Sequence, residues 1–241
     1  PRLEVGTVDH GLRPDSVAEA RLVADIAARL GLPHCILRWS GAKPTTAIQE
    51  TARQARYLLL AERARQAAVQ PAAIVTAHHA EDQAETVLMR LARGSGVDGL
   101  AAMAPRRKVA GVALLRPLLA IAKARLVATL RRAGIAYADD PTNRDPRFTR
   151  ARLRSAMPTL AREGLAPGRL ALLARRARRA DEALETAVAQ AAARLAPGPW
   201  PEHGPIAFPA GGYAELPGEI ALRLLGRAID RVGNEGPVEL A

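Results

Sequence analysis

Apolar runs of five to seven residues alternate with amphipathic segments through the first 133 residues. The apolar runs predict strands at Arg2–Val8, His34–Trp39, 72–76 and Val109–Leu115. The segments between and after them have helical spacing, at Val17–Leu30, 45–68, from Ala80 to about residue 93, and at Lys123–Ala133. Strand–helix–strand spacing of this kind predicts parallel strands joined by right-handed crossovers. The fold class indicated is therefore α/β, with a doubly wound parallel sheet.

The second half of the chain is mainly helical. Arg169–Leu195 predicts one long helix rich in Ala, Leu and Arg, and Glu219–Val232 predicts a final amphipathic helix. The segment between them is rich in Pro and Gly, with a short strand expected at Pro205–Pro209. We therefore expect an α/β domain over residues 1–155 and a smaller, mainly helical region over residues 156–241.

Residues 77–103 hold the densest polar chemistry in the chain. One arc of the predicted helix is apolar and faces the core; it contains Ala84, Val87, Leu88 and Leu91. The opposite arc is polar and contains Asp82, Glu85, Thr86, Arg90 and Arg93. Asp82 and Glu85 are three residues apart, so their carboxylates are neighbours. The helix then meets Gly94-Ser95-Gly96, whose small residues let backbone N–H groups approach an anion.

A simpler interpretation fits the same pattern. A solvated helix with an acidic patch often ends at a glycine that serves only as its C-cap. The Asp82/Glu85 spacing alone therefore does not establish a site, and a longer match is needed to favour one.

Positive charge is concentrated in the middle of the chain. The net charge is +11, and residues 105–182 carry 19 Lys and Arg against 6 Asp and Glu. Such a segment is the electrostatic footprint of contact with the phosphate backbone of a nucleic acid. An Arg-rich composition could also reflect a GC-rich genome, but that would spread the charge evenly. With 3% aromatic residues, nucleic-acid binding would depend on charge more than on base stacking.

Composition also excludes several classes of protein. The single cysteine, Cys35, excludes an internal disulfide framework and a cysteine-cluster metal site. No 18-residue apolar run is present, and the start of the chain lacks the layout of a signal peptide. We therefore expect a cytoplasmic protein with no membrane partner.

The 77–103 segment as a whole resembles the signature of the tRNA(Ile)-lysidine synthetases, a family of N-type ATP pyrophosphatases. Their signature is an H-x-x-D-D-Q-x-E-T helix followed by an R-G-x-G-x-x-G-L loop. The matching positions here are His79, Asp82, Gln83, Glu85, Thr86, Arg93, Gly94, Gly96, Gly99 and Leu100. Glu81 stands where the family usually has its first Asp. Weaker matches at 8–13, 49–57 and 116–119 extend the resemblance over roughly residues 3–160.

The resemblance implies a nucleotide-binding domain like those of the adenine nucleotide alpha hydrolases. It implies that ATP, with Mg²⁺, adenylates the C2 carbonyl oxygen of the wobble cytidine in tRNA(Ile) bearing a CAU anticodon. Free L-lysine then displaces AMP to give lysidine. Asp82 and Glu85 would orient the lysine ammonium and accept its proton. Arg56, and next Arg53, would neutralise phosphate charge in the transition state.

The resemblance also implies further substrate and nucleotide contacts, and no residue is assigned as a metal ligand. These contacts are His10, His79, Arg53, Arg93, Gly94, Ser95, Gly96, Asn143 and Arg150. Ala151 replaces the Asn of the family's R-N-x-x-R element, so Asn143 and Arg150 are the firmer positions there. A structural turn locked by Asx hydrogen bonds is the alternative interpretation of the 139–145 loop.

The S-G-G-x-D-S loop with which this class binds ATP does not occur in the sequence. By the resemblance, the loop and the first strand would precede Pro1, so we expect residues 1–241 alone to fold poorly or to bind no ATP. Two alternatives stay open. One is a 2-thiocytidine synthetase, which uses clustered cysteines that this chain lacks; the other is a non-catalytic RNA-binding relative. A homodimer is compatible with the sequence, which does not decide the oligomeric state.

Overall fold

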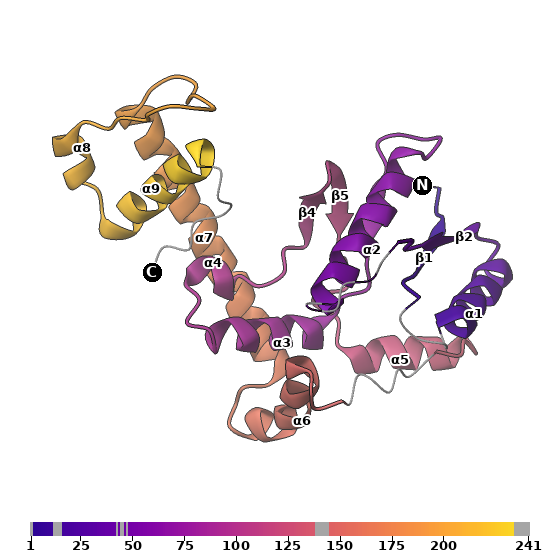
Figure 1. Ribbon diagram of the computed structural model, residues 1–241. Coiled ribbons are helices and arrows are strands. Elements are labelled where there is room, and N and C mark those ends of the chain that lie inside the picture. The colour runs from indigo at the N-terminus through magenta and orange to yellow at the C-terminus, as the bar shows by residue number, and fades with distance from the viewer. Residues whose placement is uncertain are drawn as a thin grey trace.

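The computed structural model describes residues 2–11, 16–41, 43, 46, 48–137 and 145–233 (Figure 1). The strands are β1 (Val5–Asp9), β2 (His34–Arg38), β3 (Ala73–Val75), β4 (Arg106–Val109) and β5 (Val112–Leu115). The helices of the first half are α1 (Ser16–Arg29), α2 (Ile48–Arg65), α3 (Ala80–Leu91), α4 (Val97–Leu100) and α5 (Lys123–Arg132). Those of the second half are α6 (Thr149–Arg162), α7 (Pro167–Leu195), α8 (Ala210–Ala214) and α9 (Gly218–Val232).

The parallel pairing expected at the start of the chain is confirmed. Strands β1 and β2 pair in parallel from Val5 opposite His34 to Asp9 opposite Arg38, with α1 between them in the chain and packed against both. The carboxylate of Asp9 joins this strand end to α1, because it accepts hydrogen bonds from the Gly11 N–H at 3.0 Å and the Ser16 hydroxyl at 2.9 Å.

The expectation of one strand over 109–115 is wrong. The segment belongs to a hairpin in which β4 pairs antiparallel to β5, and β5 also pairs in parallel with β3. The turn residues Ala110 and Gly111 both have positive φ, at 46° and 81°, which is what a two-residue hairpin turn of matching twist requires. The described strands thus form two sheets, one two-stranded and one three-stranded, rather than one continuous parallel sheet.

Three apolar clusters hold these elements together. Under α2, Tyr57 and Ala61 pack on Ile74 and Leu114 of the three-stranded sheet. A second cluster joins α3 to the start of α7, and a third joins the end of α7 to α9. Helix α2 also contacts β1, so it bridges the two sheets. The α/β fold class is confirmed. The mainly helical part is in direct contact with this domain, because α7 packs against α3.

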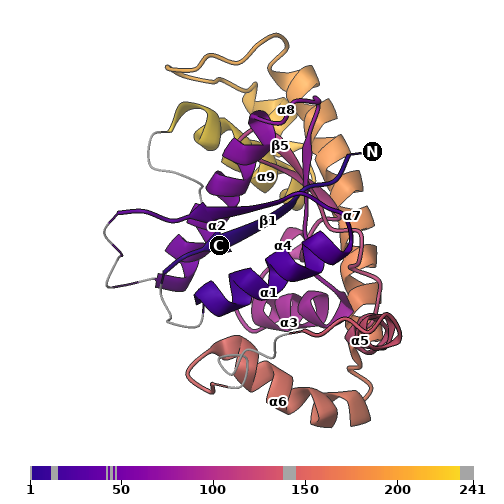
Figure 2. The same ribbon diagram turned by 90° about the vertical axis from the view of Figure 1, so that its right-hand side faces the viewer.

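The long helix of the second half is also confirmed, with Pro167 in its first turn, where a missing N–H costs nothing. Figure 2 shows α7 running along one side of the whole molecule. The strand expected at Pro205–Pro209 is wrong: these residues form no ladder, and Phe208 instead packs between Trp200 and Tyr213. Helix α6 runs without a break across residue 155, where we expected the domains to divide.

Within the part of the chain that is described, no helix is long and apolar enough to cross a membrane.

Candidate functional site

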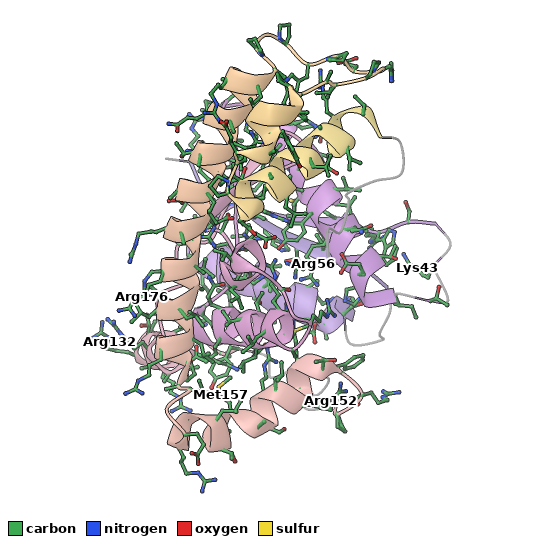
Figure 3. The ribbon with its side chains drawn as sticks, turned by 90° about the vertical axis from the view of Figure 1, so that its left-hand side faces the viewer. Lys43, Arg56, Arg132, Arg152, Met157 and Arg176 are labelled. Carbon is green, nitrogen blue, oxygen red and sulfur yellow. The ribbon has the colours of Figure 1, made fainter. Side chains whose placement is uncertain are left out.

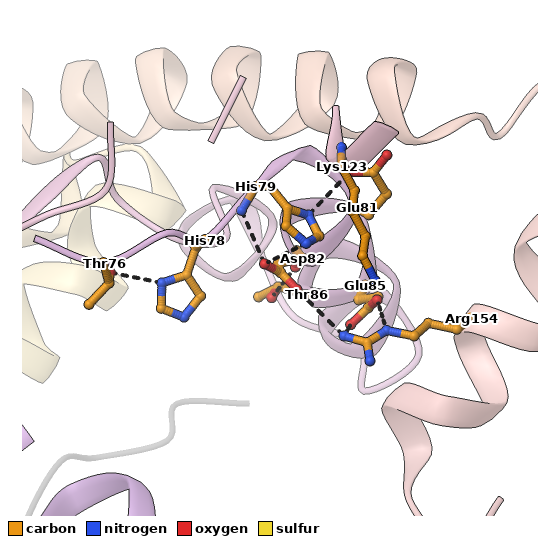
Figure 4. A network of polar contacts seen from close by, with 9 residues as sticks. All are labelled: Thr76, His78, His79, Glu81, Asp82, Glu85, Thr86, Lys123 and Arg154. Carbon is orange, nitrogen blue, oxygen red and sulfur yellow. Dashed lines mark hydrogen bonds and ion pairs between the residues drawn. The ribbon is translucent and has the colours of Figure 1, made fainter. Parts of the chain in front are cut away.

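The N-terminal end of α3 lies just beyond the carboxyl end of β3, where α/β sheets bind their ligands. His79 is the N-cap of α3, and its backbone N–H donates to Asp82 Oδ2 at 3.0 Å (Figure 4). A carboxylate in the first turn also complements the positive end of the helix dipole. The sequence thus places Asp82 where one of its oxygens, Oδ2, fixes the helix start.

Asp82 and Glu85 do share one face, as predicted, and that face is covered by α6. Arg154 of α6 forms a two-pronged ion pair with Glu85, with Nε 2.5 Å from Oε1 and Nη2 3.2 Å from Oε2. The same Nη2 lies 3.5 Å from Asp82 Oδ1. Glu85 is only 1% exposed and Thr86 only 8%, so the interpretation of this arc as a solvated face is wrong.

The two carboxylates therefore differ in what they can still bind. Glu85 is buried, and both of its oxygens are held by one guanidinium group. Asp82 has a longer contact to the same group and is more accessible, with 14% of its side chain exposed. Asp82 is the carboxylate that retains capacity for a further cation.

His78 lies close enough to Asp82 for the charge of this carboxylate to act on its ring. Its Nδ1 lies 2.9 Å from the Thr76 hydroxyl, which fixes the ring (Figure 4). Burial lowers the pKa of His78 to about 4; the negative charge of Asp82 opposes the shift, and the positive charges of Arg116, Arg53 and Arg150 add to it. The imidazole is therefore neutral at physiological pH.

His79 and Glu81 connect this end of α3 to α5. Nδ1 of His79 lies 3.1 Å from Glu81 Oε2, and the same oxygen accepts the backbone N–H of Lys123 at 2.9 Å. Lys123 is the first residue of α5, so Glu81 stabilises a helix start. The glutamate that departs from the family pattern thus has a structural role in this chain.

Gln83, another matched position, is also structural. Its side-chain amide donates to the Met103 carbonyl and accepts the Met103 N–H, both at 3.0 Å, and the residue is only 5% exposed. This double hydrogen bond pins the segment after the glycine loop against α3.

The structure favours Arg53 over Arg56 as the arginine of α2 that serves the site. Arg53 is half-buried, and its charge contributes to the lowered pKa of His78. Arg56 is exposed; Figure 3 shows where it lies among the arginines of the other helices.

The glycine loop lies at the other end of α3, about 18 Å away for a helix of 12 residues. There the backbone N–H groups of Arg93, Gly94 and Ser95 donate to the α3 carbonyls of Arg90 and Leu91. These three N–H groups are used by the helix C-cap, so none is left for an anion. A phosphate-binding role for Arg93, Gly94, Ser95 and Gly96 stays a prediction. Such a phosphate would bind at the C-terminal end of α3, away from Asp82.

The remaining predicted residues divide as follows. Arg150, at the start of α6, is half-buried and acts electrostatically on His78, so it belongs to the site. His10 lies at the carboxyl end of β1, in the other sheet. Asn143 lies outside the described residues.

Sequence reasoning missed Arg154, and it left the role of His78 open. Arg154 belongs to the R-x-x-x-R element that starts at Arg150, and i, i+4 spacing on a helix puts both arginines on one face. That spacing was the available signal. The order of the chain gave no indication that this face covers α3.

The fold and the site define a class of protein. A family model described as a PP-loop domain matches residues 2–160, which is more than half of the chain. Among solved structures, the U34-tRNA thiolase NcsA from Methanococcus maripaludis, with its [4Fe-4S] cluster, superposes with a TM-score of 0.60 at 17% identity. The match covers 75% of this chain and 63% of that one, and it shows a shared fold. This is an ATP-binding domain of the PP-loop class.

Curated relatives define the family more narrowly. The tRNA(Ile)-lysidine synthase of Bradyrhizobium sp. (strain BTAi1 / ATCC BAA-1182) is 59% identical over all of this chain, which spans 68% of that protein. The tRNA(Ile)-lysidine synthase of Rhodopseudomonas palustris (strain ATCC BAA-98 / CGA009) is 54% identical, again over all of this chain and 68% of the relative. The chain belongs to the tRNA(Ile)-lysidine synthase family, whose members are ATP-dependent, ligase-type enzymes of tRNA modification.

Proposed function

We propose that the protein joins L-lysine to C2 of the wobble cytidine in tRNA(Ile) with a CAU anticodon, at the N-terminal end of α3. The names of its relatives support the reaction as a whole. One observation supports the location: Asp82, a carboxylate with remaining capacity, acts electrostatically on the neutral ring of His78, as do the positive charges of Arg53, Arg116 and Arg150.

The reaction has two steps, and each makes a different electrostatic demand. First, the cytidine O2 attacks the α-phosphorus of ATP, and pyrophosphate leaves. Positive groups stabilise the charge that builds up on the phosphate oxygens, and Arg53 and Arg150 are placed to do this. Second, the lysine Nε forms a bond to C2 while the C2–O bond breaks and AMP leaves.

The second step requires a cation to be held and then deprotonated. Asp82 can bind the lysine ammonium and take its proton as the C–N bond forms. Glu85 is the weaker candidate for this role, because Arg154 already neutralises it. Its contribution is indirect: the Glu85–Arg154 pair holds α6, and with it Arg150, against α3.

The residues present fit ATP better than they fit a resident metal. Arginines suit the phosphates, whereas the described residues include no group of three or more His, Cys, Asp and Glu side chains that could hold a metal ion. Mg²⁺ usually keeps several waters and binds through substrate phosphates, where it would supply additional charge neutralisation. We therefore assign it to the phosphates of ATP and to no residue of this chain.

Labelled-lysine incorporation into a CAU-anticodon tRNA(Ile) transcript, with ATP, tests the proposal. The whole gene product should incorporate lysine, and Asp82→Asn should reduce the rate by about 100-fold or more because the amide cannot accept the proton. Asp25→Asn, an exposed change on α1, is the matched control. An Asp82→Asn enzyme as active as that control would remove Asp82 from the mechanism. A folded wild-type enzyme that incorporates no lysine would contradict the function itself.

A further inference from the structure

Tyr57 of α2 is the centre of an arginine cluster in which the reaction proposed above uses Arg53 but not Arg107. The tyrosine is 5% exposed and packs in the apolar cluster under α2. The guanidinium carbon of Arg53 lies 5.3 Å from the centre of its ring, and that of Arg107 lies 5.4 Å from it. Both distances are those of cation–π contacts, so two arginines from separate elements share one aromatic ring.

Arg116 supports this arrangement from the interior. It is only 3% exposed, its Nη1 donates to the Ala104 carbonyl at 2.7 Å, and its Nε is buried without a hydrogen-bond partner among the described residues. Burial lowers the pKa of Arg116, a hydrogen bond with Tyr57 opposes the shift, and the charges of Arg107 and Arg53 add to it. Three positive charges thus converge on one place.

The cluster lies at the ligand-binding edge of the three-stranded sheet. Arg116 follows the last residue of β5, and Arg107 of β4 is opposite Leu114, near that same end of β5. The charges of Arg53 and Arg116 both act on His78, so the cluster adjoins the proposed site.

No carboxylate balances these charges among the residues that the structure describes. Elsewhere arginines have carboxylate partners: Arg154 pairs with Glu85, and Arg223 pairs with Asp181, Glu185 and Glu219. Arg53, Arg107 and Arg116 have none in the described ranges. Convergent guanidinium groups without a protein counter-ion are suited to bind a phosphate, with which they can form forked hydrogen bonds.

We propose that Arg53 and Arg107, on either side of Tyr57 and backed by Arg116, form a subsite for the polyphosphate of the nucleotide, which becomes the departing pyrophosphate. The identity of the nucleotide rests on the function proposed above. Arg107 is exposed, Arg53 is half-buried and Arg116 is buried, so the first two can touch the ligand and Arg116 is a positioning residue. A backbone phosphate of tRNA has the same chemistry and is the competing source.

Arg107→Ala separates these two sources, and Arg106→Ala is the matched control. Adjacent residues of a strand point to opposite faces, so Arg106→Ala removes the same charge from the same strand but away from Tyr57. We expect Arg107→Ala to raise the KM for ATP and to weaken inhibition by inorganic pyrophosphate, each by about tenfold, with the KM for tRNA within about twofold of wild type. A higher KM for tRNA with the KM for ATP unchanged would overturn the proposal in favour of backbone phosphate.

Calorimetric titration of inorganic pyrophosphate into the whole gene product, without tRNA or lysine, keeps this test independent of the reaction. The wild type and Arg106→Ala should bind pyrophosphate, and Arg107→Ala should bind it about tenfold more weakly. Equal binding by all three proteins would refute the subsite even in an active enzyme. Conversely, weakened binding by Arg107→Ala alone would support the subsite even if no lysine were incorporated.

Arg116→Lys tests the positioning role. Lysine keeps the charge but cannot bond Tyr57 and Ala104 together, so the KM for ATP should rise while kcat stays within about twofold of wild type. A fall in kcat at saturating ATP, with an unchanged KM, would contradict this role.

Discussion

Helix α3 is one regular helix of 12 residues, yet its two ends are built in opposite ways. At the N-terminal end, side chains arrive from α2, β5 and α6, and the charges of Arg53, Arg116 and Arg150 act on one histidine. At the C-terminal end, the backbone N–H groups of the loop donate to carbonyls of the same helix, and α4, which follows the loop, packs on α7. Both ends carry motif residues. What supports our proposal of a site at the N-terminal end is convergence from distant segments, which a motif in one segment cannot show.

Breaking the ion pair that covers the N-terminal end should have the largest effect on stability. Arg154→Met leaves the carboxylate of Glu85 buried without its partner, and such a loss costs about 3 kcal/mol. Urea unfolding measures it, with Arg152→Met, an exposed change on the same helix, as the control. If the two variants were equally stable, the Glu85–Arg154 pair would not be what holds α6 on α3.

At the C-terminal end of α3, stability should instead depend on the close packing of Gly99 against Ser95. A Cβ on Gly99 would lie 2.3 Å from the Cβ of Ser95, so Gly99→Ala should cost about 2 kcal/mol of stability through overpacking. Ser95→Gly removes the atoms in the way, so the double variant should regain part of the loss in the same urea experiment. Additive effects of the two changes would argue against this close approach.

Removing one arginine at each end of α3 tests which end contributes to lysine incorporation. Arg150→Ala, at the N-terminal end, should lower kcat/KM for lysine incorporation by about tenfold, through the loss of a charge beside the reacting phosphate. Arg93→Ala, at the far end, should change it by less than about twofold, because its exposed side chain lies a helix length away. Equal losses would mean that the glycine loop shares the site after all.

A pH dependence of stability is also expected, from His78. Its pKa is lowered from 6.5 to about 4, so the unfolded chain binds a proton in this interval that the folded chain does not. His78 therefore contributes stability above pH 6.5, and this contribution is lost as the pH falls towards 4. His78→Asn removes the titration, so its stability relative to wild type should improve over that range. A difference that stays constant with pH would show that His78 does not titrate in this way.

Much of the fold could be predicted from the spacing of apolar residues within single elements. The parallel β1–β2 pair, α3 and α7 follow from periodicity, because each is set by which of its own residues are apolar. The β4–β5 hairpin does not, because Ala110-Gly111 turns the chain through backbone angles that the apolar run on either side conceals.

The site was predictable in its motif and unpredictable in its surroundings. A helical wheel puts Asp82 and Glu85 on one face, but only the packing of α6 shows that Glu85 is buried and paired. The order of preference between Arg56 and Arg53 stays a prediction, although the surroundings of Arg53 favour it for the same reason. The direction of each arginine matters only relative to Tyr57 and β4, which come from tertiary contacts.

Helix α7 determines both how far α9 lies from α3 and on which side of the helix axis α9 packs. Its first turns pack through Leu170 and Ala174 on α3, and its last through Val188 and Leu195 on α9. Over 29 residues it spans about 43 Å, and each residue advances the helix by about 1.5 Å and turns it by about 100°. Inserting one residue in its middle would leave both contacts chemically intact but swing α9 to another side of the molecule. An insertion of about seven residues, close to two turns, would return α9 to its original side of the helix axis. Helix α7 should therefore tolerate changes in length only in whole turns.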